Sequence, residues 1–145
     1  SVEGSELASL ADHEIVVEVG PEVIAGSTRL KAGTATKLVL NMLTTAAMVR
    51  TGKTYGNLMV DVQTGSEKLK DRARRIIAIV TGVDYDEAGR LLKEARFHTK
   101  AAIVMQKTGV TYAQAVRRLK KADESIREAI GEDIEPRLRE ILRIG

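Results

Sequence analysis

The first half of the chain combines one short apolar run with one long helical pattern. Residues 15–17 are three consecutive β-branched residues, and they precede the breaker Gly20. Such a run is typical of a strand covered on both faces, so its partner strands must come from elsewhere. From residue 28 to residue 49 apolar side chains recur at helical spacing, and Gly52 follows as a terminator. This pattern predicts one long helix over residues 27–51.

The second half is predicted to be a succession of helices separated by glycines and cap residues. A helix is predicted to begin at Ser66 and end at Gly82, with its apolar side chains on one face. Three shorter helices are predicted within residues 84–122, with Asp84 and Thr111 as N-caps. Their core is expected around Ala88, Leu92, Ile103, Val116 and Leu119. Residues 53–65 are predicted as an irregular connector, shorter helical pieces follow to residue 145, and no internal repeat is recognised.

Composition supports a mainly helical fold and excludes several classes of site. Of the 145 residues 43% are hydrophobic but only 3% are aromatic, so the core must be aliphatic, a palette that favours helices over a β-sandwich. The net charge of +3 does not by itself imply nucleic acid. The lack of cysteine excludes disulfides and suits a reducing compartment. Two scattered histidines predict no zinc site, and neither a signal peptide nor an apolar run of roughly 20 residues is found.

Cations stand at the wrong end of the predicted long helix. Arg29 and Lys31 lie in its first turns, where they oppose the positive pole of the helix dipole. Hydroxyl residues and free amides at a helix start bind anions, so Ser27, Thr28, Arg29 and Lys31 are candidate residues of an anion site. The alternative is that the two cations are solvated or pair with Glu18 or Glu22.

Two further groups of residues are candidates for chemistry. The carboxylates Glu14, Glu18 and Glu22 belong to no recognisable catalytic motif. The stretch "KTGVTYAQAVRRLKKA" is typical either of a helix-turn-helix or of a corner in a small helical bundle. In the first case its base-reading residues would be Thr111, Tyr112 and Gln114. A small DNA-binding or protein-interaction module therefore stands as an alternative function.

Three stretches carry a resemblance to a known family. They are "VGPEVIAGSTRLKAGTATKLVLNMLTTAAMVRTGKTYGNLMVDV", "KLKDRARRII" and "KAAIVM". Residues 19–130 resemble the C-terminal half of bacterial N-acetylmuramic acid 6-phosphate etherases. These are sugar isomerase (SIS) family enzymes related to the glucokinase regulatory protein. On this resemblance the helix-turn-helix stretch falls within a helical bundle of the family.

The resemblance implies a fragment of a cytoplasmic lyase of peptidoglycan recycling. The family cleaves the D-lactyl ether of N-acetylmuramic acid 6-phosphate, giving N-acetylglucosamine 6-phosphate and D-lactate, without a cofactor or metal. Its two acidic residues lie in the N-terminal half, so no catalytic residue is expected in this chain. Ser27, Thr28, Arg29 and Lys31 are then expected to bind the sugar phosphate substrate, through its phosphate or its lactyl carboxylate. The protein is expected to be a homodimer that contacts neither nucleic acid nor membrane.

The resemblance also implies a division of the chain. Residues 1–60 would be the last strand and long helix of an α/β SIS domain, and residues 61–83 a connecting helix. Residues 84–130 would form a ubiquitin-associated-type (UBA-like) three-helix bundle. Residues 131–145 are expected to form a helical C-terminal extension beyond the usual end of the family.

Overall fold

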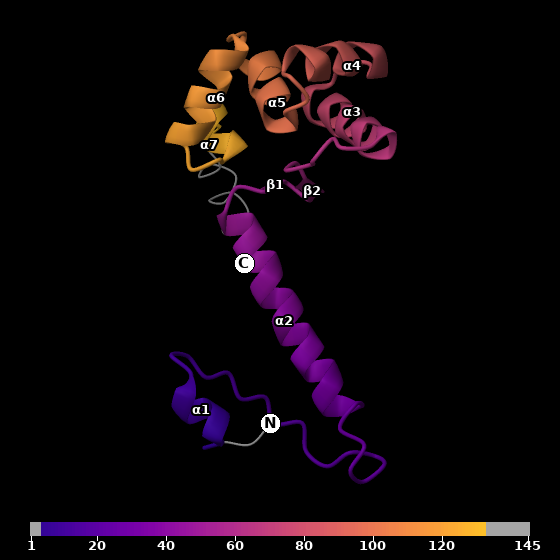
Figure 1. Ribbon diagram of the computed structural model, residues 1–145, viewed down its shortest axis with the longest axis vertical. Helices are drawn as coiled ribbons and strands as arrows, with labels where there is room; N and C mark the ends of the chain where they lie inside the picture. The colour runs from indigo at the N-terminus through magenta and orange to yellow at the C-terminus, as the bar shows by residue number, and fades with distance from the viewer. Residues whose placement is uncertain (1–3, 133–145) are drawn as a thin grey trace, which may run out of the picture. The chain divides into compact units, whose positions relative to one another are not determined.

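The computed structural model describes residues 4–132 and divides them into two compact units that meet between Ala47 and Met48 (Figure 1). The predicted helical extension lies outside the described residues, except for residues 131 and 132.

The first unit contains two helices and no strand among its described residues. Helix α1 spans Glu6–Leu10, and the Ser5 hydroxyl caps it by accepting from the Ala8 amide at 3.2 Å. Helix α2 spans Lys31–Arg50, so it begins later than predicted. The prediction of a strand over residues 15–17 is wrong, since these residues form no strand in the structure. A strand needs a hydrogen-bonded neighbour, and no other described residue pairs with this segment.

Helix α2 is apolar on most sides yet uncovered within its own unit. Over twenty residues its only charges are Lys31, Lys37 and Arg50, and none of its residues is buried. Leu38 is 51% exposed and Met42 63% exposed. A helix that is apolar nearly all round is normally buried in a larger core. No helix within residues 4–132 combines the length and apolar character needed to cross a bilayer.

The second unit begins with a small hairpin where the sequence predicted an irregular connector. Strand β1, Thr54–Tyr55, pairs antiparallel with β2, Leu58–Met59. The two-residue turn contains Gly56 at φ +59°, a conformation that glycine adopts without strain. Strands of only two residues show no alternation of apolar and polar positions, so the sequence pattern did not predict them.

Five helices follow the hairpin. They are α3 Glu67–Thr81, α4 Tyr85–Glu94, α5 Thr99–Thr108, α6 Tyr112–Lys121 and α7 Ile126–Ile130. The predicted caps are confirmed: Ser66 and Asp84 accept from amides of the first turn, and Gly82 ends α3 in the left-handed conformation. Thr111 forms a capping box with Gln114. The three short helices predicted within residues 84–122 are therefore confirmed as α4, α5 and α6.

Helix α5 is the centre of this bundle. It packs against α3 and α4 on one side and against α6 and α7 on the other (Figure 1). Every residue of α5 from Thr99 to Met105 is buried. Leu92, Ile103 and Leu119 are at most 1% exposed, as predicted, and Val116 packs partly buried against them. The buried core of this unit therefore lies among residue 60 and the helices α3 to α7.

The bundle contains an internal repeat that the sequence reading missed. Residues 81–95, "TGVDYDEAGRLLKEA", correspond to "TGVTYAQAVRRLKKA" 27 residues later. In each copy a left-handed glycine ends one helix, and a tyrosine begins a helix of ten residues. The hydroxyls of Thr81 and Thr108 both donate to the carbonyl four residues before.

The repeat extends through the turns that follow α4 and α6. Arg96 and Phe97 have positive φ angles, and so do Asp123 and Glu124 at the corresponding positions. The Phe97 amide donates to the Leu92 carbonyl at 2.8 Å, and the Glu124 amide donates to the Leu119 carbonyl at 2.9 Å. Side chains at these turn positions differ between the copies, which hid the repeat from a reading of side-chain patterns alone.

Candidate functional site

The start of α2 is held by a carboxylate from the preceding loop. The two oxygens of Glu22 accept hydrogen bonds from the Lys31 amide at 2.9 Å and the Ala32 amide at 3.0 Å. The Lys31 ammonium donates to the Pro21 carbonyl at 2.9 Å. Glu22 therefore supplies the negative charge that the positive pole of α2 favours. The hydrogen bonds from Ala32 and Lys31, with the Lys31 charge, lower the pKa of Glu22 below its ordinary 4.5.

The four predicted anion-site residues are neighbours along the chain. No hydrogen bond between their side chains is found in this described segment. Ser27 and Thr28 belong to the turn before α2, in which the Leu30 amide donates to the Ser27 carbonyl at 3.2 Å. The Arg29 side chain is exposed and forms no ion pair within residues 4–132. Lys31 opens the helix. Two hydroxyls, the Arg29 guanidinium and the Lys31 ammonium, which already donates one hydrogen bond to Pro21, thus lie along one short segment.

Sequence reasoning missed the capping role of Glu22, although it named this residue as a partner for the cations. The separation of nine and ten residues between the carboxylate and the two amides has no standard capping pattern. The available signal was the absence of any acidic residue in the first turn of α2. A helix start without an acid must find its acceptors elsewhere.

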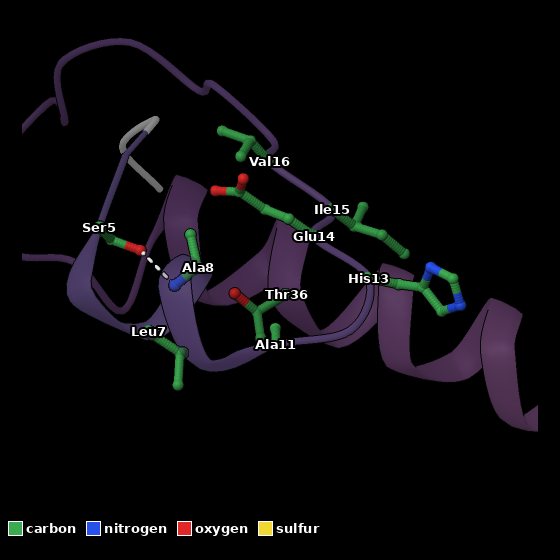
Figure 2. A pocket seen from close by; sticks show the side chains of 9 residues that line it. All are labelled: Ser5, Leu7, Ala8, Ala11, His13, Glu14, Ile15, Val16 and Thr36. Carbon is green, nitrogen blue, oxygen red and sulfur yellow. Dashed lines mark hydrogen bonds between the residues drawn. The ribbon is translucent and has the colours of Figure 1, made fainter.

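Two hollows lie in the first unit beside α2. One, of about 370 Å³, lies among α1, the following loop and Thr36 of α2. Figure 2 shows Glu14, Ser5, Ala8 and Thr36 around this hollow, with the imidazole of His13 directed away. The Ser5 and Thr36 hydroxyls are engaged with the backbone of their own helices. The other hollow, of about 600 Å³, is mostly apolar and lies between Val19 and the first turns of α2.

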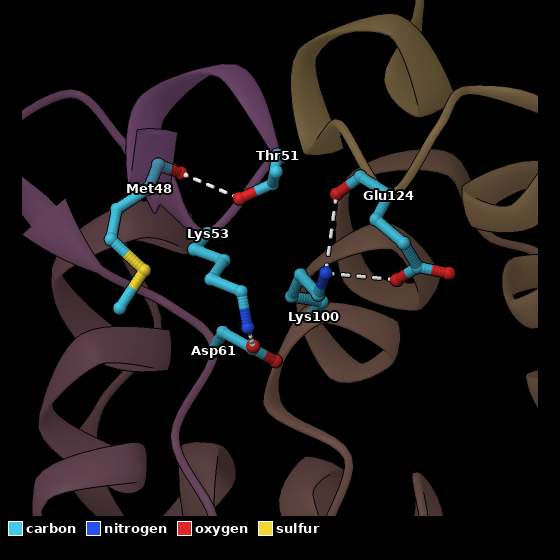
Figure 3. A network of polar contacts seen from close by, with 6 residues as sticks. All are labelled: Met48, Thr51, Lys53, Asp61, Lys100 and Glu124. Carbon is cyan, nitrogen blue, oxygen red and sulfur yellow. Dashed lines mark hydrogen bonds and ion pairs between the residues drawn. The ribbon is translucent and has the colours of Figure 1, made fainter. Parts of the chain in front are cut away.

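The second unit contains a polar network of a structural kind (Figure 3). The Lys100 side chain is 4% exposed, and its ammonium donates to the Glu124 carboxylate at 2.8 Å and to the Glu124 carbonyl at 3.3 Å. Lys53 pairs with Asp61 at 2.8 Å across the hairpin. The hydrogen bond from Lys53, with the charges of Lys100 and Lys53, lowers the pKa of Asp61. Each charge here has a partner, so the network offers no free group for a ligand.

The network closes around a close backbone approach. Gly52 has φ +65°, and a Cβ built on it would lie 2.6 Å from the Glu124 carbonyl group. The chain before the hairpin therefore rests directly on the turn between α6 and α7. Burial lowers the pKa of the neighbouring His98 below its ordinary 6.5. Among the described residues no His, Asp and Glu cluster in a way that could hold a metal ion.

The residues of the helix-turn-helix alternative are occupied within the bundle. The Gln114 side chain accepts from the Thr111 amide at 3.0 Å and from its hydroxyl at 3.1 Å. The Tyr112 ring lies under the Arg96 guanidinium, 5.1 Å away. These side chains stabilise the start of α6 and its contact with the α4–α5 turn, so no observation favours base reading by them.

Comparison with known proteins identifies what the chain is similar to. No family model matches the chain. It is 56% identical over 120 residues to an N-acetylmuramic acid 6-phosphate etherase of Exiguobacterium sp., covering 83% of the chain and 41% of that relative. It is 54% identical over 133 residues to the enzyme of the same name from Rubrobacter xylanophilus, covering 92% and 44%.

A third etherase, from Mycolicibacterium smegmatis, is 54% identical over 121 residues, 83% of the chain and 41% of the relative. These identities confirm the resemblance drawn from the sequence. The chain spans about two fifths of the length of these curated relatives. It therefore belongs to the N-acetylmuramic acid 6-phosphate etherases, of which it represents a part.

Proposed function

We propose that the protein to which this chain belongs hydrolyses the D-lactyl ether of N-acetylmuramic acid 6-phosphate. Water is added overall, and the products are N-acetylglucosamine 6-phosphate and D-lactate. The supporting observation is the identity of 50–56% to several bacterial etherases over most of the chain. In this proposal the chain supplies no catalytic carboxylate, because the family's acidic pair lies in the part that the chain does not represent. The reaction belongs to cell-wall recycling in the cytoplasm.

A direct assay tests this proposal. The full-length protein, incubated with N-acetylmuramic acid 6-phosphate, is expected to release D-lactate in a stoichiometric ratio to N-acetylglucosamine 6-phosphate. The 145-residue chain assayed in parallel is expected to release none above the buffer blank. Absence of D-lactate from the full-length protein would remove the proposed function. Turnover by the chain alone would show that it carries the acid and base groups.

We infer that residues 1–60 belong to an α/β SIS domain and residues 84–130 to a UBA-like bundle. The apolar, uncovered surface of α2 supports the first part, since such a helix needs other elements packed on it. The side-chain caps of α4 and α6, and the buried apolar residues of α4, α5 and α6, support the second. A crystal structure of the full-length protein would test both assignments.

We further propose that Ser27, Thr28, Arg29 and Lys31 bind an anion of the substrate, either the 6-phosphate or the lactyl carboxylate. Because Glu22 already accepts from the first two amides of α2, the anion would bind to the side chains instead. The two hydroxyls can donate, and the guanidinium and ammonium add charge-assisted hydrogen bonds. Arg29 carries most of this proposal, since its side chain is exposed and has no ion-pair partner within the described residues.

Kinetics of the full-length enzyme would test the anion site. Arg29→Ala and Lys31→Ala are each expected to lower kcat/KM by an amount worth roughly 1–3 kcal/mol. Lys37→Ala is the matched control, because Lys37 lies more than a turn further along α2 and should leave kcat/KM unchanged. Wild-type kinetics in both site variants, with a loss of stability, would make these residues structural.

We infer that the protein is a homo-oligomer in which α2 is covered. The support is its exposed apolar side chains, which water disfavours over a broad face. Sedimentation of the full-length protein at micromolar concentration is expected to give a dimer or larger species. A single monomeric species would contradict this inference.

A further inference from the structure

A groove of about 470 Å³ lies between α6 and α7, where the described part of the bundle ends. Its apolar lining, the floor, consists of Ala122 at 8% exposure, Ala129 at 7% exposure and the partly buried Ile130, and its polar lining includes Arg118, Lys121 and Glu128. The two cations form no ion pair with any other residue between positions 4 and 132. The groove thus joins an apolar floor to an unpaired positive side.

The internal repeat indicates what belongs in such a groove. The floor residues correspond, 27 positions earlier, to Ala95, Ala102 and Ile103, all of which are fully buried in the core. In that first copy the surface is covered because α6 and α7, the next helices along the chain, pack onto α5. In a repeat array each unit is covered by its neighbour. By this equivalence the segment that follows α7 should cover the second copy.

The chemistry of the following segment matches the groove. Gly131 ends α7 in the left-handed conformation and lies itself on the groove. The next residues include the acids Asp133 and Glu135, with Ile134 between them. Further along the chain Leu138, Ile141 and Leu142 alternate with the charged residues Arg137, Arg139, Glu140 and Arg143. We propose that residues 133–145 dock into the α6–α7 groove, with the acids against Arg118 and Lys121 and apolar residues against the floor. This proposal is independent of the proposed enzymatic function.

Zero-length carbodiimide crosslinking of the intact chain tests the docking. The reagent joins a carboxylate to an ammonium only when the two are in contact. Lys120 and Lys121 are neighbours on α6 and stand equally close to the acids in sequence, but only Lys121 lines the groove. Mass spectrometry is expected to find Asp133 or Glu135 linked to Lys121 about tenfold more often than to Lys120, since docking raises the effective concentration at one lysine.

A double variant supplies the control. Leu138→Asp with Ile141→Asp removes apolar contacts with the floor but keeps every acid and lysine used in the crosslink, so the preference for Lys121 should disappear. Circular dichroism checks that the bundle of the variant is intact. Equal linkage to Lys120 and Lys121 in the unaltered chain would overturn the proposal. Links found only between two chains, with a yield that falls on dilution, would assign the groove to a second copy and overturn it equally.

Discussion

Helix α2 and helix α5 are both rich in apolar residues, yet only α5 has a place to bury them. Four helices surround α5, and its residues from Thr99 to Met105 are buried. None of the twenty residues of α2 is buried. The helical bundle therefore buries its apolar residues among its own helices, whereas α2 leaves its apolar residues exposed. This difference agrees with relatives more than twice as long as the chain.

The largest difference in the cost of a substitution, measured as free energy of unfolding, is expected between two leucines. Leu92 is 1% exposed in the bundle core and Leu38 is 51% exposed on α2. Leu92→Ala should lower the free energy of unfolding by roughly 2–5 kcal/mol, through lost transfer energy and the cavity left behind. Leu38→Ala should change it by less than about 0.5 kcal/mol, measured by urea denaturation at concentrations where the chain is monomeric. A large cost at Leu38 would show that α2 is already covered in the monomer.

Two glycines with the same backbone conformation test whether the chain before the hairpin packs on the bundle. Gly52→Ala would place a Cβ 2.6 Å from the Glu124 carbonyl group, whereas Gly56 has open space around it. Gly52→Ala is expected to cost about 3 kcal/mol and Gly56→Ala about 1 kcal/mol, because the second change brings only left-handed strain. Thermal unfolding of both variants measures the difference. Equal costs would mean that the chain before the hairpin does not rest on the α6–α7 turn.

The buried ammonium of Lys100 should matter more than the half-exposed one of Lys53. Lys100→Met removes two hydrogen bonds to Glu124 and is expected to cost about 1–2 kcal/mol. Lys53→Met removes a pair whose side chains are each 38% exposed, so about 0–1 kcal/mol is expected. Denaturant titration of both variants decides the order. A larger cost for Lys53→Met would show that Lys53, and not Lys100, contributes most to the stability of the network.

The smallest effect concerns the cap of α2. Because folding lowers the pKa of Glu22 below 4.5, the unfolded chain binds more protons as the pH falls through this range. The cap therefore stabilises α2 above pH 4.5 and is lost as the pH falls through the lowered pKa. The helical signal of the chain should exceed that of Glu22→Gln at neutral pH and converge with it in acid. A difference that persists at the lowest pH would exclude the carboxylate as its source.

The sequence predicts best the elements whose signals are local. Ser66, Gly82, Asp84 and Thr111 mark helix ends correctly because caps and left-handed glycines act within a few residues. The strand at residues 15–17 was predicted wrongly because strands depend on partners that the sequence pattern does not locate. The start of α2 was missed by several residues because its cap, Glu22, comes from a loop nine residues away.

At the candidate site, too, the local features are predicted from the sequence and the long-range contacts are not. The sequence shows cations near the start of the long helix, and in the structure Lys31 is the first residue of α2 while Arg29 lies in the turn before it. The engagement of the first amides with Glu22 depends on the path of the loop, which no local pattern specifies. The repeat escaped notice for a related reason. It is preserved in backbone conformation at Arg96 and Asp123, where the side chains have opposite charges.

The two turns in which residues other than glycine adopt the left-handed conformation are also positions where a substitution by glycine could raise stability. An L-residue in that conformation costs roughly 1–2 kcal/mol relative to glycine, somewhat less for aspartate. Phe97 and Glu124 use their side chains in contacts with Lys70 and Lys100, so replacing them would exchange one stabilisation for another. Asp123 forms no contact of this kind with another described residue. A designer who seeks a more stable scaffold could therefore begin at position 123, where the side chain is exposed.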